Sequence, residues 1–177
     1  MHRLGAARQR VPARRGVVSP SCDARGMDVT LQVTIDCADP VTLVNFWTEA
    51  LGYQPEPAPG GHPSWRAYWE DMGVPAEELT EGVGETPESI VDPEGRGPRI
   101  WFQRVPEGKT VKNRVHLDLK VGGGRGVPLP ERTRRIAAKV DRLVATGATV
   151  LRIMDEPDMD YYGVVLRDPE GNEFCVG

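Results

Sequence analysis

The segment VDPEGRGPRIWFQRV at residues 91–105 has a shorter counterpart, LRDPEGNEFCVG, at residues 166–177. In both, Asp-Pro-Glu-Gly runs into a short apolar stretch. Asp at the first position, Pro at the second and Gly at the fourth suit a type I β-turn, so each segment is expected to form a hairpin. The repetition predicts that the chain contains one structural unit twice.

A segment in which apolar and polar residues alternate precedes each hairpin, at residues 28–37 and 114–121. Alternation with period two is typical of a half-buried strand. The polar faces of the two strands comprise Gln32, Thr34 and Asp36, and Arg114, His116, Asp118 and Lys120. These two faces either close on each other as a polar cup or simply face water.

An amphipathic helix is expected after each of these strands. Asp39 suits the N-cap of the first helix, Pro40 its first position and Gly52 its end. The second helix is expected over residues 131–148. Further strands are expected at 64–69, 99–105, 149–154 and 161–167, with residues 70–89 as a solvated insertion. The sequence therefore predicts an α+β fold of two tandem βαβββ modules, at about 28–106 and 113–177.

Composition narrows the class of protein. A chain of 177 residues with 39% hydrophobic and 27% charged residues is typical of a globular domain. No apolar run approaches the roughly 18 residues of a membrane span. The three cysteines are widely spaced without a CxxC motif, which favours a reducing, cytoplasmic location.

The first 26 residues differ from the rest, because they contain six Arg and one Asp. Their charge of +5 leaves −9 on the remainder, given a total of −4. An acidic domain argues against a nucleic-acid partner. The segment is expected to be disordered, as an extension upstream of a start at Met27, an organelle transit peptide or a basic arm.

The helix ending FWTEALGY, the turn DPEGNEF and the segment PRIWFQRVPEGKTVKNRVHLDL together resemble glyoxalase-like proteins of the vicinal oxygen chelate superfamily. That superfamily includes glyoxalase I, extradiol dioxygenases, fosfomycin-resistance enzymes and bleomycin-binding proteins. The resemblance covers roughly residues 28–177 and implies a cup-like half-barrel and a homodimer. Because this fold hosts unrelated reactions, the resemblance specifies no single one.

The resemblance also implies positions for a divalent metal ion, Zn, Ni, Mn or Fe, on the first and last strands of each module. The matching residues are Gln32, Gln103, His116 and Cys175. Both glutamates of the family pattern are missing, which leaves Asp118 or Cys175 as the replacement ligand, or a site without metal. True glyoxalase I activity is not expected, because the family uses a metal-bound glutamate as the base.

Two functions remain open from the sequence. The first is a lyase or isomerase acting on a small oxygenated molecule, with His116 and Asp118 as catalytic residues. Its substrate would contact Gln32, Thr34, Trp101, Gln103 and Arg114. The second is a non-catalytic protein of the bleomycin-resistance kind that binds a small molecule, such as an antibiotic, in the same cup or in a crevice between the subunits of a dimer.

Aromatic residues are the last feature of note. Trp65 and Trp69, with Tyr68, are expected either to line a pocket for a flat organic ligand or to pack in a core or dimer contact.

Overall fold

The computed structural model describes residues 30–79 and 82–177. The basic segment 1–26 lies outside these residues, so its predicted disorder stays a prediction. None of the helices in the described ranges is long and apolar enough to cross a membrane.

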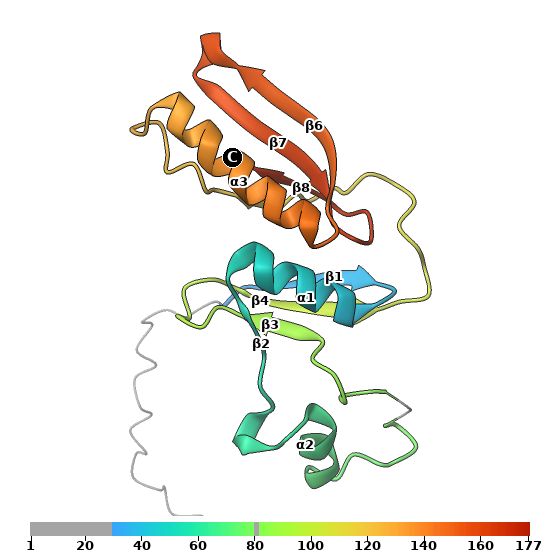
Figure 1. Cartoon of the computed structure of the whole chain (residues 1–177). Coiled ribbons are helices and arrows are strands. Elements are labelled where there is room, and N and C mark those ends of the chain that lie inside the picture. The colour runs from blue at the N-terminus through green and yellow to red at the C-terminus, as the bar shows by residue number, and fades with distance from the viewer. Residues whose placement is uncertain (1–29, 80–81) are drawn as a thin grey trace, which may run out of the picture.

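The described residues form two modules that share the order βαβββ, with the helix α2 added in module one (Figure 1). Module one comprises β1 (Gln32–Cys37), α1 (Pro40–Leu51), β2 (Gln54–Pro55), α2 (Trp65–Asp71), β3 (Ser89–Val91) and β4 (Arg99–Arg104). Module two comprises β5 (Asp118–Leu119), α3 (Leu129–Ala145), β6 (Thr149–Glu156), β7 (Tyr161–Arg167) and β8 (Glu173–Val176). Short 3-10 turns lie at Pro59–Gly61 and Pro157–Met159.

The two sheets have equivalent topologies, β1-β4-β3-β2 and β5-β8-β7-β6. In each, the first strand pairs in parallel with the last, and the other pairs are antiparallel. The predicted α+β fold of paired βαβββ modules is therefore confirmed. The sheets do not close into a barrel (Figure 1).

Both repeated turns form as predicted. The Gly95 N–H donates to the Asp92 carbonyl over 3.0 Å, and the Gly171 N–H donates to the Asp168 carbonyl over 2.9 Å. Both glycines have positive φ, 67° and 90°, which favours residues without a Cβ. Each turn joins the last two strands of its module, so the sequence repeat corresponds to a structural repeat.

The first helix also begins and ends where its signals lie. The Asp39 carboxylate accepts a hydrogen bond from the Val41 N–H over 3.2 Å. Gly52 ends α1 in the left-handed conformation. The second predicted helix is shifted slightly and spans Leu129–Ala145.

The strand predicted at residues 64–69 is wrong, because this segment is the helix α2. Ser64 caps it, accepting a hydrogen bond from the Ala67 N–H over 3.1 Å. Trp65, Tyr68 and Trp69 follow the i, i+3, i+4 spacing of one helical face. The β-propensity of aromatic residues favoured a strand, but the cap and the spacing specify a helix.

The strand predicted at residues 114–121 is also wrong in length, because only Asp118–Leu119 is a strand. Its partner β8 begins at Glu173 and therefore offers few ladder positions. The Cys175 N–H donates to the Leu117 carbonyl and the Gly177 N–H to the Leu119 carbonyl, both over 2.9 Å. Residues 105–117 form an irregular connection between the modules.

One hydrophobic core spans both modules, because α1 lies between its own sheet and module two (Figure 1). Phe46 and Trp47 of α1 pack edge-on against Phe174 of β8, with ring centroids 5.8 and 5.2 Å apart. All three side chains are essentially buried. The Lys139 ammonium of α3 also donates to the Glu49 carbonyl over 2.8 Å.

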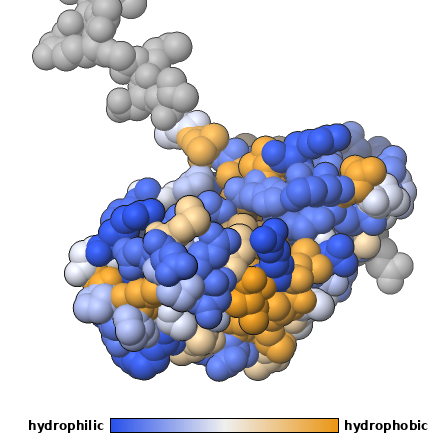
Figure 2. All heavy atoms as spheres, turned by 90° about the horizontal axis from the view of Figure 1, so that it is seen from above, coloured by the Kyte–Doolittle hydropathy of each residue, from blue (hydrophilic) through white to orange (hydrophobic). Residues whose placement is uncertain are grey.

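The strand β6 lies at the edge of the module-two sheet. Seen from above the view of Figure 1, polar and apolar side chains share the surface of the molecule (Figure 2). β6 pairs only with β7 among the described strands, and its Val150, Leu151 and Ile153 are exposed. Unpaired edges of this kind are able to pair with another chain. The homodimer that the resemblance implies stays a prediction.

Candidate functional site

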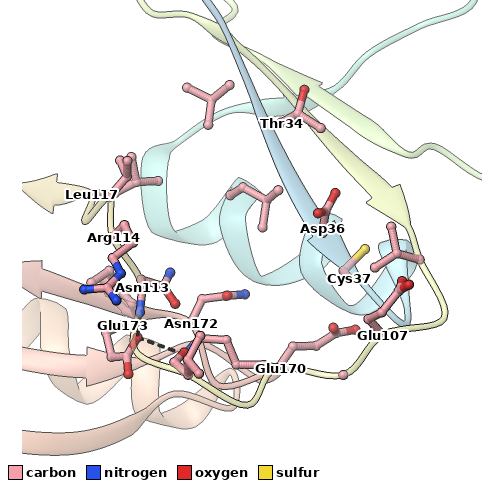
Figure 3. A pocket seen from close by; sticks show the side chains of 18 of the residues that line it. Thr34, Asp36, Cys37, Glu107, Asn113, Arg114, Leu117, Glu170, Asn172 and Glu173 are labelled. Atoms are coloured by element: carbon pink, nitrogen blue, oxygen red, sulfur yellow. Dashed lines mark hydrogen bonds and ion pairs between the residues drawn. The ribbon is translucent and has the colours of Figure 1, made fainter.

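A pocket of about 660 Å³ lies at the junction of the two modules (Figure 3). Three segments supply its walls: β1, the connection between the modules, and the second Asp-Pro-Glu-Gly turn with the start of β8. Its volume falls within the range of roughly 300–1,000 Å³ that is usual for small-molecule sites.

The first wall is β1, which lies at the edge of its sheet and therefore offers both faces to the pocket. The polar side chains Gln32, Thr34 and Asp36 alternate along it with Val33 and Ile35, as the period-two pattern predicted. The pocket thus receives both hydrogen-bonding groups and apolar surface from a single strand.

The second wall is the connection, which Glu173 holds in place. The Glu173 carboxylate accepts a hydrogen bond from the Asn113 N–H over 3.0 Å and pairs with the Lys109 ammonium at 3.1 Å. These two contacts lower the pKa of Glu173 to about 2, so it stays ionised at neutral pH. Sequence reasoning missed this residue; its only signal is a charge at the start of an otherwise apolar last strand.

The third wall is the second turn, which bonds directly to module one. The Glu170 carboxylate accepts hydrogen bonds from the Ala38 N–H over 2.7 Å and the Asp39 N–H over 2.6 Å. The buried Asp168 carboxylate accepts one from the Trp47 indole N–H over 3.2 Å. The pocket is therefore bounded by a built joint between the modules.

Three charged side chains of the pocket have no hydrogen bond or ion pair to another described residue: Asp36, Glu107 and Arg114. Of these, Asp36 and Arg114 carry opposite charges. They lie on different walls, β1 and the connection (Figure 3). By contrast, Glu170, Glu173 and Lys109 are engaged in the contacts that hold the walls together. Asp36 and Arg114 are thus available to a ligand.

The structure separates the site residues predicted from sequence. Gln32, Thr34 and Arg114 line the junction pocket. Trp101 lines a second cavity, and Gln103 is paired in register with Asp36 on β4. The other predicted residues lie outside the pocket lining, His116 in the connection, Asp118 on β5 and Cys175 on β8.

The metal positions implied by the resemblance do not fit a divalent ion. The Gln32 side-chain oxygen accepts a hydrogen bond from the Arg99 guanidinium over 2.9 Å, and the His116 Nε2 lies 2.8 Å from the Lys112 ammonium. The Gln32 oxygen and the His116 Nε2, the two atoms that would bind the metal, are therefore each already in contact with a cationic side chain.

The thiol is no better suited. Burial and the neighbouring Asp118 carboxylate raise the pKa of Cys175, so the thiol stays protonated at neutral pH, whereas metals bind the thiolate. Among residues 30–79 and 82–177, no three His, Cys, Asp or Glu are grouped to hold a metal ion.

The paired modules and the pocket at their junction define a protein of the vicinal oxygen chelate class. The sequence profile of the glyoxalase-like domain matches residues 32–177, so the chain belongs to the glyoxalase-like family. Among curated protein sequences, none is significantly similar to it.

Solved structures share the fold at low sequence identity. A glyoxalase/bleomycin resistance/dioxygenase family enzyme from Burkholderia phytofirmans PsJN is 18% identical, with a TM-score of 0.50 over 82% of this chain and 94% of that one. The hypothetical protein SA1046 from S. aureus is 13% identical, with a TM-score of 0.51 over 85% and 94%.

A point mutant of the fosfomycin resistance protein FosX from Listeria monocytogenes is 10% identical, with a TM-score of 0.51 over 85% and 90%. That structure contains Mn(II) and 1S,2S-dihydroxypropylphosphonic acid. At these identities the similarity shows the fold alone, and the function has to be argued from this chain's own site.

Proposed function

We propose that this glyoxalase-like protein binds a small oxygenated molecule in the junction pocket without a metal ion. The observation that carries the proposal is the pair of opposite charges, Asp36 and Arg114, which have no partner among the described residues, whereas Glu170, Glu173 and Lys109 are engaged in contacts between the walls. Guanidinium groups donate to carbonyl and carboxylate oxygens, and carboxylates accept from hydroxyl groups. A molecule that carries both kinds of oxygen would satisfy both residues.

The charge of the pocket limits the ligand further. Four carboxylates line it, those of Asp36, Glu107, Glu170 and Glu173, against the two cations Lys109 and Arg114. The formal excess is two negative charges, which disfavours a polyanion. A neutral or singly charged hydroxy- or keto-compound suits the pocket better.

Catalysis is the second candidate, because a free carboxylate in a pocket is the chemical requirement for a general base. Asp36 would then remove a proton from the bound molecule, as a lyase or isomerase requires. The sequence predicted His116 and Asp118 for this role, and both lie outside the pocket lining. A protein that binds an antibiotic, as in the bleomycin-resistance kind, would use the same pocket without Asp36 chemistry.

Ligand-detected NMR on the full chain would test binding, with hydroxy-ketones, diols and hydroxy-monocarboxylic acids as probes and EDTA present throughout. We expect Arg114→Ala to weaken the best probe at least tenfold. Arg125→Ala, an exposed arginine outside the pocket, is the matched control and should leave affinity unchanged. Binding that requires added metal, or that survives Arg114→Ala, would contradict the proposal.

The same probes separate binding from catalysis. Each is incubated with the protein and followed by NMR for new resonances. If a probe is converted, Asp36→Asn should abolish conversion while affinity changes little. If binding occurs without conversion of any probe, the non-catalytic function is supported.

A further inference from the structure

A second cavity, of about 290 Å³, lies on the face of the module-one sheet opposite α1. Trp101 and Arg99 of β4 and Ser89 of β3 form its floor. Trp65 and Trp69 of α2 form its roof. Three of the four tryptophans of the chain therefore surround one cavity.

These tryptophans are not core residues. Trp47 is 1% exposed and Phe102 is fully buried, whereas the cavity tryptophans are all only half-buried. No residue of α2 is buried. Large aromatic surfaces left partly in water forgo stabilisation of about 25 cal/mol per Å². Packing within module one therefore does not account for their position.

Polar contacts, rather than apolar packing, hold the roof over the floor. The Trp65 indole N–H donates to the Glu56 carbonyl over 3.2 Å. The Arg66 backbone N–H donates to the Gly84 carbonyl over 3.0 Å, and its guanidinium donates to the Leu79 carbonyl over 2.9 Å. The rings are thus positioned while the space between roof and floor stays open.

The arrangement of the rings leaves their faces available. The Trp65 and Trp69 centroids are 5.9 Å apart, and their planes are inclined by 46°, so the two rings do not stack on each other. Gly84 closes one side against the Trp69 ring, where an added Cβ would lie 2.7 Å from a ring carbon. Only a residue without a side chain allows that approach.

The charges of the floor are neutralised internally. The Arg99 guanidinium bonds to the Glu56 carboxylate over 2.7 and 2.6 Å, and the Ser89 hydroxyl donates to the same oxygen over 2.6 Å. Burial by itself would raise the pKa of Glu56, but these bonds outweigh it and hold the pKa below its ordinary value. An ion pair of this kind adds no net charge to the cavity.

We propose that this cavity is a second binding site, which takes a flat aromatic molecule without negative charge between Trp65, Trp69 and Trp101. The inference goes beyond the junction pocket, which lies between the modules and contains the charged side chains of Asp36 and Arg114. Stacking on tryptophan selects planar rings. The Arg99–Glu56 pair adds no net charge, and the carboxylate of Glu88, which also lines the cavity, disfavours an anion. The volume of about 290 Å³ lies just below the usual range for small-molecule sites, which fits a ligand of about two fused rings.

Calorimetric titration of the full chain with 2-naphthol and with decahydro-2-naphthol tests the proposal. The two probes share a carbon skeleton and a hydroxyl group, and only the first is planar. We expect 2-naphthol to bind at one site per chain and at least tenfold more tightly than its saturated analogue. Equal affinities for the two probes would overturn the proposal.

Variants locate the binding. Trp101→Ala should weaken the binding of 2-naphthol at least tenfold, whereas Trp101→Phe should retain most of the affinity. Tyr161 is an exposed aromatic residue outside the cavity, so Tyr161→Ala is the control and should leave the affinity unchanged. If Trp101→Ala fails to fold, Trp69→Ala removes the roof instead. Loss of binding in Arg114→Ala but not in the tryptophan variants would assign the probe to the junction pocket and overturn the second site.

Discussion

The two Asp-Pro-Glu-Gly turns have the same four residues but different surroundings. In the first turn, the Asp92 carboxylate accepts, among the described residues, from the backbone N–H groups of Glu94, Arg96 and Gly97, all within five positions of it. In the second, Asp168 is 3% exposed and also accepts from the Trp47 indole of module one. One turn closes a hairpin, whereas the other closes a hairpin and joins two modules.

This difference shows where the stability of the joint resides. Asp168 accepts further hydrogen bonds from the Glu170 N–H and from the backbone and side chain of Asn172. Its carboxylate therefore fixes the conformation of the turn. The turn places the Glu170 carboxylate against the N–H groups of Ala38 and Asp39, just before α1. A carboxylate buried at this joint organises contacts on both sides of it.

The largest expected effect is that of Asp168→Ala. It would leave the buried Trp47 indole and the half-buried Asn172 amide without an acceptor, so we expect a loss of about 2–4 kcal/mol in the free energy of unfolding. Urea titration followed by tryptophan fluorescence measures it.

Asp92→Ala is the matched control for that experiment. Its three donors belong to a turn that water reaches, so the loss should be clearly smaller. Equal losses in the two variants would mean that the turn sequence, rather than the joint, determines stability.

A moderate effect is expected for Glu170→Gln. The amide retains one acceptor oxygen for the Ala38 and Asp39 N–H groups but places a donor where the second oxygen was. We expect a loss of about 1–2 kcal/mol, since hydrogen bonds to charged groups exceed those to neutral ones. Thermal unfolding measures the change.

Glu94→Gln in the first turn is the control for this substitution. The Glu94 side chain pairs only with the exposed Arg96 among the described residues, so its replacement should leave the melting temperature nearly unchanged. A destabilisation as large as that of Glu170→Gln would contradict a joint between modules.

Local signals explain what the sequence could predict of the fold. The turns, β1, α1 and β4 depend on period, caps and turn residues that lie within a few positions of each other. β5 was overestimated because strand length depends on the partner strand. α2 was mistaken because aromatic residues were given more weight than the Ser64 cap.

In the site, too, the features that depend on neighbouring residues could be predicted, and those that depend on distant segments could not. Strand parity placed Gln32 and Thr34 in the pocket, because alternation is a local property. It could not reveal Glu170 or Glu173, whose partners are backbone N–H groups distant in the sequence. Backbone donors carry no sequence signature, so these roles are visible only in three dimensions.

The smallest expected effect, and the sharpest comparison, is the titration of the two aspartates. Hydrogen bonds from backbone N–H groups, that of Glu94 above all, lower the pKa of Asp92 below its ordinary value of 3.8. Burial raises the pKa of Asp168 above that value, against the hydrogen bonds from Asn172 and Trp47. Carboxyl ¹³C NMR of aspartate-labelled protein would follow both, with Asp92→Asn and Asp168→Asn to assign the signals.

The signs of the two contributions to stability are opposite. Asp92 contributes stability above pH 3.8, which is lost as the pH falls through its folded pKa. For Asp168 the pH-dependent part of the stability is complete below pH 3.8 and is lost as the pH rises through its folded pKa, whereas the hydrogen bonds that its carboxylate accepts remain. If Asp92 and Asp168 titrated with midpoints on the same side of pH 3.8, the predicted difference between the two turns would be wrong. Because the four turn residues are identical, midpoints on opposite sides would arise only from the surroundings, water for one carboxylate and the joint between modules for the other.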